Sequence, residues 1–194
     1  GFQIQCGIRA QGGASRNADR SPKHAMSLRF RRAYGEGRLN YPIIKDSPQT
    51  SFDAVHLRAR YNNSWIHNDN GQRTRGQLIR DQWARDSMID MGTISAGHGS
   101  YMHLYLNGLY WGIYGAHERM DNAHYADYYG GRSDEVDAVN GGRATAGDLT
   151  SYRAMQDAAR DGDWDEMTAR LDIDNYIVWH IILRFGSYRD WKND

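Results

Sequence analysis

The chain has 194 residues, with 24 acidic side chains, 24 basic side chains and a single cysteine, Cys6. This length suits one domain, or one and a half. The balanced charge argues against a nucleic-acid partner and against binding to an anionic membrane surface. A lone cysteine excludes an intrachain disulfide and a cysteine-based metal site. The sequence has no apolar run that would span a bilayer and no cleavable signal pattern.

Alternating side chains predict a β-rich first half of the chain. Strands are predicted over residues 2–9, 24–31 and 52–61, and a polar loop over 62–71. The inward-facing side chains are predicted to be Ala25, Leu28 and Phe30 in the second strand, and Val55, Leu57 and Ala59 in the third.

A glycine-rich, basic turn joins the first two predicted strands. It contains Gly12, Gly13, Ser15 and Arg16, and Lys23 opens the next strand. Glycines let backbone N–H groups approach an anion closely, and arginine and lysine supply positive charge, so the turn suits a nucleotide phosphate. It has neither P-loop spacing nor a complete G-x-G-x-x-G. A hairpin with a solvated basic turn, and a solvent lysine at a strand start, explain the same residues.

The middle of the chain combines a helix with a hairpin. A helical period over 74–91 ends at Gly92, a natural C-terminal stop. Asn107-Gly108 then separates two alternating apolar runs, 101–106 and 110–114. This pattern is the strongest short-range signal for a β-hairpin. A further helix is predicted over 117–129.

The last part of the chain is predicted to be mainly helical. Residues 130–147 are glycine-rich and polar, which predicts a loop or a short irregular strand. Helices are predicted over 149–160, 163–171 and 175–185, the last of them capped by Asp172 or Asp174. The apolar side chains of that last helix predict that it is buried in the core. Strands followed by helices predict an α+β fold: an antiparallel-sheet-rich N-terminal lobe followed by a helical segment.

Three polar side chains stand where they could do chemistry. Glu118 follows the hairpin, where it would line a cleft or simply favour the first turn of a helix. Asp190 and Asn193 follow the last helix, where they would position a hydroxyl and a divalent metal, or form an ordinary polar turn.

Two other groups of side chains favour no particular site. The eight histidines show no zinc-binding spacing. The aromatic side chains of the hairpin pack a sheet or, as an alternative, bind carbohydrate; they are Tyr101, Tyr105, Tyr110, Trp111 and Tyr114.

Four blocks, in this order, resemble the spore-coat-protein-H (CotH) kinase family. The third block is the most specific, and together the blocks cover nearly the whole chain. They comprise Ile8-Arg9 with Gly12, Ser15-Arg16, Pro22-Lys23 and Met26-Ser27-Leu28; Leu57-Arg58 with Ile79-Arg80-Asp81; Tyr105 to Tyr114 with Glu118 and Asp121; and Leu171 to Ile177, reaching Asp190-Trp191.

The resemblance implies an atypical protein-kinase-like fold and activity. It implies a β-rich nucleotide-binding lobe over 1–116 and a helical lobe over 117–194, with ATP and Mg²⁺ or Mn²⁺ as cofactors. The substrate would be a protein with Ser or Thr hydroxyls, at the cell or spore surface of a bacterium or outside it. The implied roles are nucleotide binding for Arg9, Ser15, Arg16, Lys23 and Glu118, catalysis for Asp190 and metal binding for Asn193.

The chain departs from the family pattern at its end. The family usually shows Asp-Trp-x-x-Asn-Asn, and Asp194 stands where the first of these asparagines would be. The second metal-binding aspartate of the family is expected beyond Asp194, so we expect the helical lobe to be incomplete and the chain as given to be inactive or nearly so. The alternative is a non-catalytic surface or coat protein, or a carbohydrate-binding domain, that retains the fold.

Overall fold

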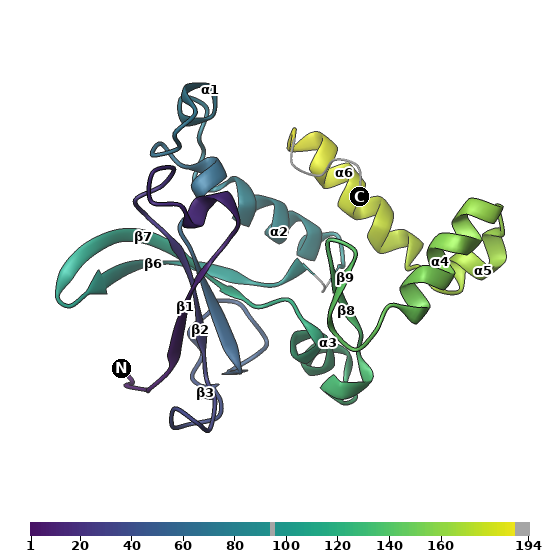
Figure 1. Ribbon diagram of the computed structural model, residues 1–194, viewed down its shortest axis with the longest axis horizontal. Coiled ribbons are helices and arrows are strands. Elements are labelled where there is room, and N and C mark those ends of the chain that lie inside the picture. Colours follow the sequence, from purple (N-terminus) through teal and green to yellow (C-terminus); the bar gives the residue numbers. More distant parts are fainter. Residues whose placement is uncertain (94–95, 189–194) are drawn as a thin grey trace. The chain divides into compact units, whose positions relative to one another are not determined.

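The computed structural model describes residues 1–93 and 96–188 (Figure 1). The chain forms two compact units. The first comprises Gly1–Arg85 and Gly97–Arg119, and the second comprises Asp86–Ala96 and Met120–Asp194. The backbone therefore passes between the units within a helix, again before Gly97, and finally after Arg119.

A five-stranded antiparallel sheet forms the centre of the first unit. Its strands lie in the order β1-β2-β5-β7-β6. Their bounds are Gly7–Gln11 for β1, Ala25–Arg29 for β2, Ala54–Arg58 for β5, Gly99–Leu106 for β6 and Leu109–Glu118 for β7. Two short strands, β3 (Leu39–Asn40) and β4 (Ser51–Phe52), pair separately. The predicted α+β class with an antiparallel sheet is confirmed.

One face of this sheet carries the apolar core. Val55, Tyr114 and Ala116 have no exposed surface, and the segment between β2 and β5 covers them with further apolar side chains. The buried cluster consists of Phe30, Leu39, Ile44, Phe52, Val55, Leu57, Ala59, Tyr114 and Ala116, with Ala25 and Leu28 half-buried against it. The alternation predicted for Val55, Leu57 and Ala59 is thus confirmed, because these side chains share the covered face.

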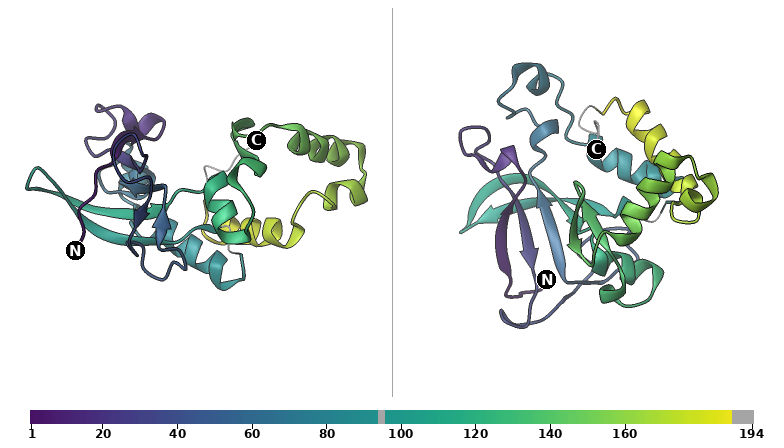
Figure 2. Two further views of the ribbon diagram at one scale, coloured as in Figure 1. Left: turned by 90° about the horizontal axis from the view of Figure 1, so that it is seen from below. Right: turned by 45° about the vertical axis from the view of Figure 1, so that its right-hand side comes forward.

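The hairpin of β6 and β7 extends well beyond the other strands of the sheet (Figure 2). Asn107 and Gly108 form its turn and both have positive φ, 51° and 81°. This is the backbone that a two-residue hairpin turn requires, and the predicted hairpin is confirmed. The helix predicted over 117–129 is wrong at its start, because His117 and Glu118 pair with His56 and Val55 and so continue β7.

The helix predicted over 74–91 is shorter than its period indicates. Helix α2 spans Arg80–Asp90. Before it, a Cβ on Gly76 would lie 3.0 Å from the Ser64 backbone, and the Trp65 indole donates to the Gly76 carbonyl. This close approach of two backbone segments competes with a helical turn. The predicted loop over 62–71 contains the start of the short helix α1 (Asn70–Arg73), which Asp69 caps.

The second unit is mainly helical. Its helices are α3 (Asn122–Tyr129), α4 (Thr150–Asp161), α5 (Trp164–Thr168) and α6 (Ile173–Phe185), with β8 (Ala138–Asn140) and β9 (Arg143–Ala146) paired in a short hairpin. Asp172 is the N-cap of α6, where its carboxylate accepts from the Asn175 N–H. None of the described helices is long and apolar enough to cross a bilayer.

The prediction that α6 is a buried core helix is wrong. Ile182 is buried and Val178, one turn earlier, is half-buried. Ile177 and Ile181 lie on the adjacent side of the helix, and both are exposed. The consecutive apolar residues cover more of the helix circumference than its neighbours do, so only one side is buried.

Candidate functional site

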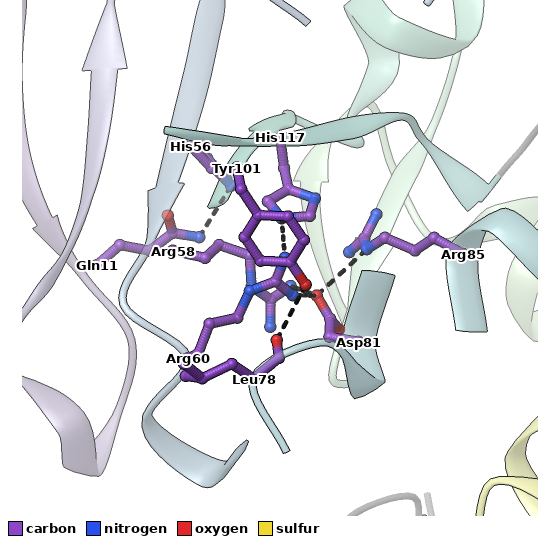
Figure 3. A network of polar contacts seen from close by, with 9 residues as sticks. All are labelled: Gln11, His56, Arg58, Arg60, Leu78, Asp81, Arg85, Tyr101 and His117. Atoms are coloured by element: carbon purple, nitrogen blue, oxygen red, sulfur yellow. Dashed lines mark hydrogen bonds and ion pairs between the residues drawn. The ribbon is translucent and has the colours of Figure 1, made fainter. Parts of the chain in front are cut away.

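The face of the first unit's sheet opposite the apolar core is polar. Residues that pair directly in an antiparallel ladder point to the same face. The register aligns Arg9, Ser27, His56 and His117 across four strands. The next residues on the same face carry further polar groups, which meet side chains of α2 (Figure 3).

Asp81, in the first turn of α2, is the centre of this polar face. Its Oδ2 lies 2.5 Å from Arg60 Nη1, 3.5 Å from Arg85 Nε and 3.6 Å from Arg58 Nη1. Burial alone would raise the pKa of the Asp81 carboxyl, but its three arginine neighbours outweigh burial and hold that pKa below its ordinary value. Asp81 is therefore a carboxylate that joins the arginines at the end of β5 to helix α2.

His117 is the second partner of Arg60. The Arg60 Nη2 group donates to His117 Nε2 over 2.7 Å. Burial, and then the positive charge of neighbouring arginines, lower the pKa of His117 to about 2. A neutral ring with an accepting Nε2 carries its proton on Nδ1, and this buried Nδ1 has no hydrogen-bond partner among the described residues.

Two glycines make room for the His117 ring. A Cβ on Gly115 would lie 2.5 Å from His117 Nε2 and 2.6 Å from Arg60 Nη2. A Cβ on Gly99, which pairs with His117 across the sheet, would lie 2.4 Å from His117 Nδ1. Both positions therefore need a residue without a side chain for the network to form.

His56 forms the third part of the polar face. The Gln11 side-chain amide lies 3.0 Å from His56 Nδ1, which accepts its hydrogen bond. Burial, and then the charges of Arg119 and other arginines, lower the pKa of His56 to about 4. Both histidines are thus neutral at pH 7, because they are buried and because the surrounding charge is positive.

Among the described residues, the polar face carries more arginines than carboxylates. Several of its buried side-chain atoms also have no hydrogen-bond partner there. Its arginines are Arg9, Arg29, Arg58, Arg60, Arg85 and Arg119, and its carboxylates are Asp53 and Asp81. Buried atoms without a partner among the described residues are Gln11 Oε1, Ser27 Oγ, Arg29 Nε, Arg60 Nε and His117 Nδ1. Buried polar groups are normally hydrogen-bonded. Gln11 Oε1 only accepts, but the other four atoms can donate, and together with the arginine charge they suit an anion.

The glycine-rich turn between β1 and β2 lies at the same end of the sheet as Arg58 and Arg60. It contains a short 3-10 helix, Ala14–Arg16, in which Arg16 is exposed. The His24 ring donates to the Ser15 carbonyl over 2.9 Å, which ties the turn to the start of β2. The register places Gln11 beside Ala25, and Leu57 beside Met26. The turn, Arg58 at the end of β5 and Arg60 just after it therefore border one end of the sheet.

Lys23 does not join the arginine network. Its ammonium donates to the Ile113 carbonyl and lies 4.3 Å from the centroid of the Tyr114 ring. Tyr114 belongs to the apolar face, so Lys23 packs on that side of the sheet. Its partial burial lowers the pKa of the Lys23 ammonium.

Glu118 is also separate from the network. It ends β7 on the apolar side, buried, and each carboxylate oxygen has a partner. Ser47 Oγ donates to Oε1 over 2.5 Å, and the His98 N–H donates to Oε2 over 2.7 Å. The units divide one residue later, after Arg119.

Of the remaining predicted site residues, Arg9 lies on the polar face, exposed on β1. Asp190 and Asn193 lie outside the described residues. Within residues 1–93 and 96–188, no three His, Cys, Asp or Glu side chains gather as a metal site would require.

Sequence reasoning named Arg58 and Asp81 only as parts of a family block, and it missed Arg60, Arg85 and His117. One signal was present: His56, Arg58 and Arg60 alternate with Val55, Leu57 and Ala59. Alternate residues of a strand point to opposite faces, so this pattern predicts a charged face opposite the apolar one. Asp81 and Arg85 are four residues apart, which places their side chains next to each other on a helix.

Two comparisons with known proteins bear on this site. The profile of one protein family, described as CotH kinase protein, matches residues 8–193, nearly the whole chain. A search of curated protein sequences found no match.

Proposed function

The chain belongs to the CotH kinase family, and from this premise we propose that it is an ATP-dependent protein kinase whose polar sheet face holds the nucleotide phosphates. The reaction would transfer the γ-phosphoryl group of ATP to a Ser or Thr hydroxyl of a protein. A kinase-like function follows from the family; the nucleotide, the residues and the acceptor are our proposal.

The contact between Asp81 and the arginines at the end of β5 carries this proposal. In protein kinases a cation on the third strand of the sheet pairs with a carboxylate on the following helix, and the pair positions the phosphates. Here β5 is the third strand of the five-stranded sheet, and α2 lies between it and β6. Arg58 and Arg60 stand in the place of the cation, and Asp81 in that of the carboxylate.

The turn between β1 and β2 would cover the same phosphates. Ser15 and Arg16 offer a hydroxyl and a guanidinium at that end of the sheet, beside Arg58 and Arg60. We propose that Lys23 moves its ammonium from the Ile113 carbonyl to a phosphate oxygen when the nucleotide binds. Phosphoryl transfer needs charge neutralisation and positioning rather than covalent chemistry, which these side chains supply.

The remaining roles follow the family resemblance. Glu118, at the end of β7, would border the adenine. Asp190 would accept the proton of the substrate hydroxyl as its oxygen attacks the γ-phosphorus and the bond to the bridging oxygen of ADP breaks. Asn193 is the residue of this chain proposed to hold Mg²⁺ or Mn²⁺.

Calorimetric titration of the chain with Mg²⁺ and ATP tests nucleotide binding, and a radiolabelled phosphoryl-transfer assay of the full-length protein on an unstructured polypeptide that contains serine tests the reaction. We expect Arg58→Gln and Lys23→Ala to weaken ATP binding about tenfold or more, since each removes a charge-assisted contact. Asp190→Ala should retain binding and lose transfer. Arg153→Gln, an exposed arginine of α4, is the control of equal charge change. Absence of ATP binding, or transfer that survives Asp190→Ala, contradicts the proposal.

A second candidate function is carbohydrate binding by the β6–β7 hairpin. Tyr105, Tyr110 and Trp111 are all exposed there, and the Tyr105 and Tyr110 ring centroids are 5.2 Å apart. Such rings offer flat apolar surfaces to a sugar. Glycan binding that Trp111→Ala abolishes, in a protein without ATP affinity, would favour this function over the first.

A further inference from the structure

A second arginine group lies on the polar face, at the opposite end of the sheet from the glycine-rich turn. The register places Gly7, Arg29 and Ala54 in one row across three strands. Val55 pairs with Glu118, so Arg119 continues this row beyond the end of β7. The small side chain of Ala54 thus lies between two arginines that come from different strands.

The positive charges of these arginines repel one another. Arg119 contacts Asp53 at 3.8 Å, and the Asp53 carboxylate offsets part of the positive charge around Arg29. The Nε of Arg29 is buried and has no hydrogen-bond partner among the described residues. Burial, and then Arg119, Arg31 and Arg9, lower the pKa of Arg29. The group therefore has the charge and the open donor of an anion site.

Arginine donors favour a phosphate or carboxylate ligand. The planar guanidinium binds such groups through two parallel hydrogen bonds, and clusters of arginines are the usual receptors for phosphorylated side chains. This group is distinct from the proposed nucleotide site. Arg29 lies four residues along β2 from Ala25, which corresponds to about 13 Å at the rise of a β-strand.

The neighbouring edge of the sheet offers a place for a peptide backbone. β1 is an edge strand of the sheet, and its residues Ile8, Arg9 and Ala10 are exposed. An edge strand presents unpaired N–H and C=O groups, to which an extended peptide adds by main-chain hydrogen bonds. Arg9 stands on this strand, diagonally across from Arg29 in the register, so we assign it to the arginine group rather than to the nucleotide.

We propose that Arg9, Arg29, Arg31 and Arg119 bind a phosphoserine side chain of an extended peptide that lies along β1. The choice of phosphoserine rests on the proposed function, because a kinase that phosphorylates serine meets its own product on any substrate that carries a second hydroxyl. The chain would thereby hold a phosphorylated substrate while further hydroxyls of that substrate react. A nucleic acid is the less favoured ligand, since the chain has no net charge.

Fluorescence anisotropy with a labelled phosphoserine peptide, in the absence of nucleotide, tests this site at about 0.15 M salt. Two control peptides carry serine or glutamate in place of the phosphoserine. We expect the phosphopeptide to bind about tenfold or more tightly than either, and the double variant Arg29→Gln/Arg119→Gln to remove this preference. Arg153→Gln is the matched control and should leave binding unchanged.

Arg9→Gln is a second variant, because its exposed side chain can be replaced without disturbing the core; it should also weaken phosphopeptide binding. Equal binding of the serine or glutamate peptide would overturn the proposal, as would binding that neither arginine variant changes. Tighter binding of a single-stranded oligonucleotide of similar length would also overturn it. These measurements need no phosphoryl transfer, so a protein that binds ATP but not the phosphopeptide refutes this inference alone.

Discussion

Replacing Asp81 by Asn tests whether one carboxylate holds the polar face together. The side chain of Asp81 is 18% exposed and that of Arg60 only 2%, with 2.5 Å between their charged atoms. Removing one partner of a buried ion pair typically costs 3–5 kcal/mol, because the other charge stays buried without compensation. Arg58 is 42% exposed and can turn to water, so we place the loss near the lower end, at about 3 kcal/mol. That is a large part of the total stability of a typical protein, about 5–15 kcal/mol.

Urea unfolding followed by circular dichroism measures this loss, and a thermal melt should show a decrease of about 6–12 °C. The control is Asp157→Asn, which removes the carboxylate of the exposed Asp157–Arg160 pair in α4 and should have little effect, as surface pairs do. A loss below about 1 kcal/mol for Asp81→Asn, or one equal to the control, would refute the reasoning. It would mean that water, rather than Asp81, neutralises the arginines.

Two further predictions concern the same face. The pKa values of His56 and His117 are lowered in the folded chain to about 4 and about 2, so their contribution to stability is complete above about pH 6.5 and is lost as the pH falls toward the folded values. Unfolding free energies measured between pH 7 and pH 4 should decrease by up to about 1.4 kcal/mol per pH unit for each histidine, and His56→Gln should flatten the curve; a curve unchanged by that variant would contradict the assignment. Gly115→Ala should destabilise by about 1–3 kcal/mol, because its Cβ would overlap the contact between His117 and Arg60. Gly13→Ala, where a Cβ meets nothing within 4 Å, is the control, and equal melting temperatures for the two variants would show that the network yields without cost.

The sheet was predictable where its signal is local. Asn107-Gly108 sets its own turn through backbone conformation, and Val55, Leu57 and Ala59 alternate because one face of β5 is covered. The end of β7 was not predictable in this way. His117 and Glu118 suit a helix start as well as a strand, and only their pairing with β5 selects the strand.

The polar face was the least predictable part. Arg60 and Asp81 are 21 residues apart, and Arg60 and His117 are 57 apart. Their contact depends on the register of β5 and β7 and on the place where α2 begins, none of which a sequence pattern fixes. For Lys23 the sequence pointed to the residue but not to its contact. Its hydrogen bond to the Ile113 carbonyl, on the other side of the sheet, depends on tertiary packing.

The neutral histidines explain how a surface with so many arginines remains folded. A protonated His117 would compete with Arg60 for Asp81 and add charge beside it, whereas the neutral ring accepts the hydrogen bond that Arg60 donates. The positive charge of the arginines also decides which ions the polar face can bind. A metal cation would meet arginines on several strands, while an anion would satisfy the buried donors at Arg29, Arg60 and His117. Charge and unmet hydrogen-bonding capacity therefore favour an anion at both ends of the sheet, as both proposals require.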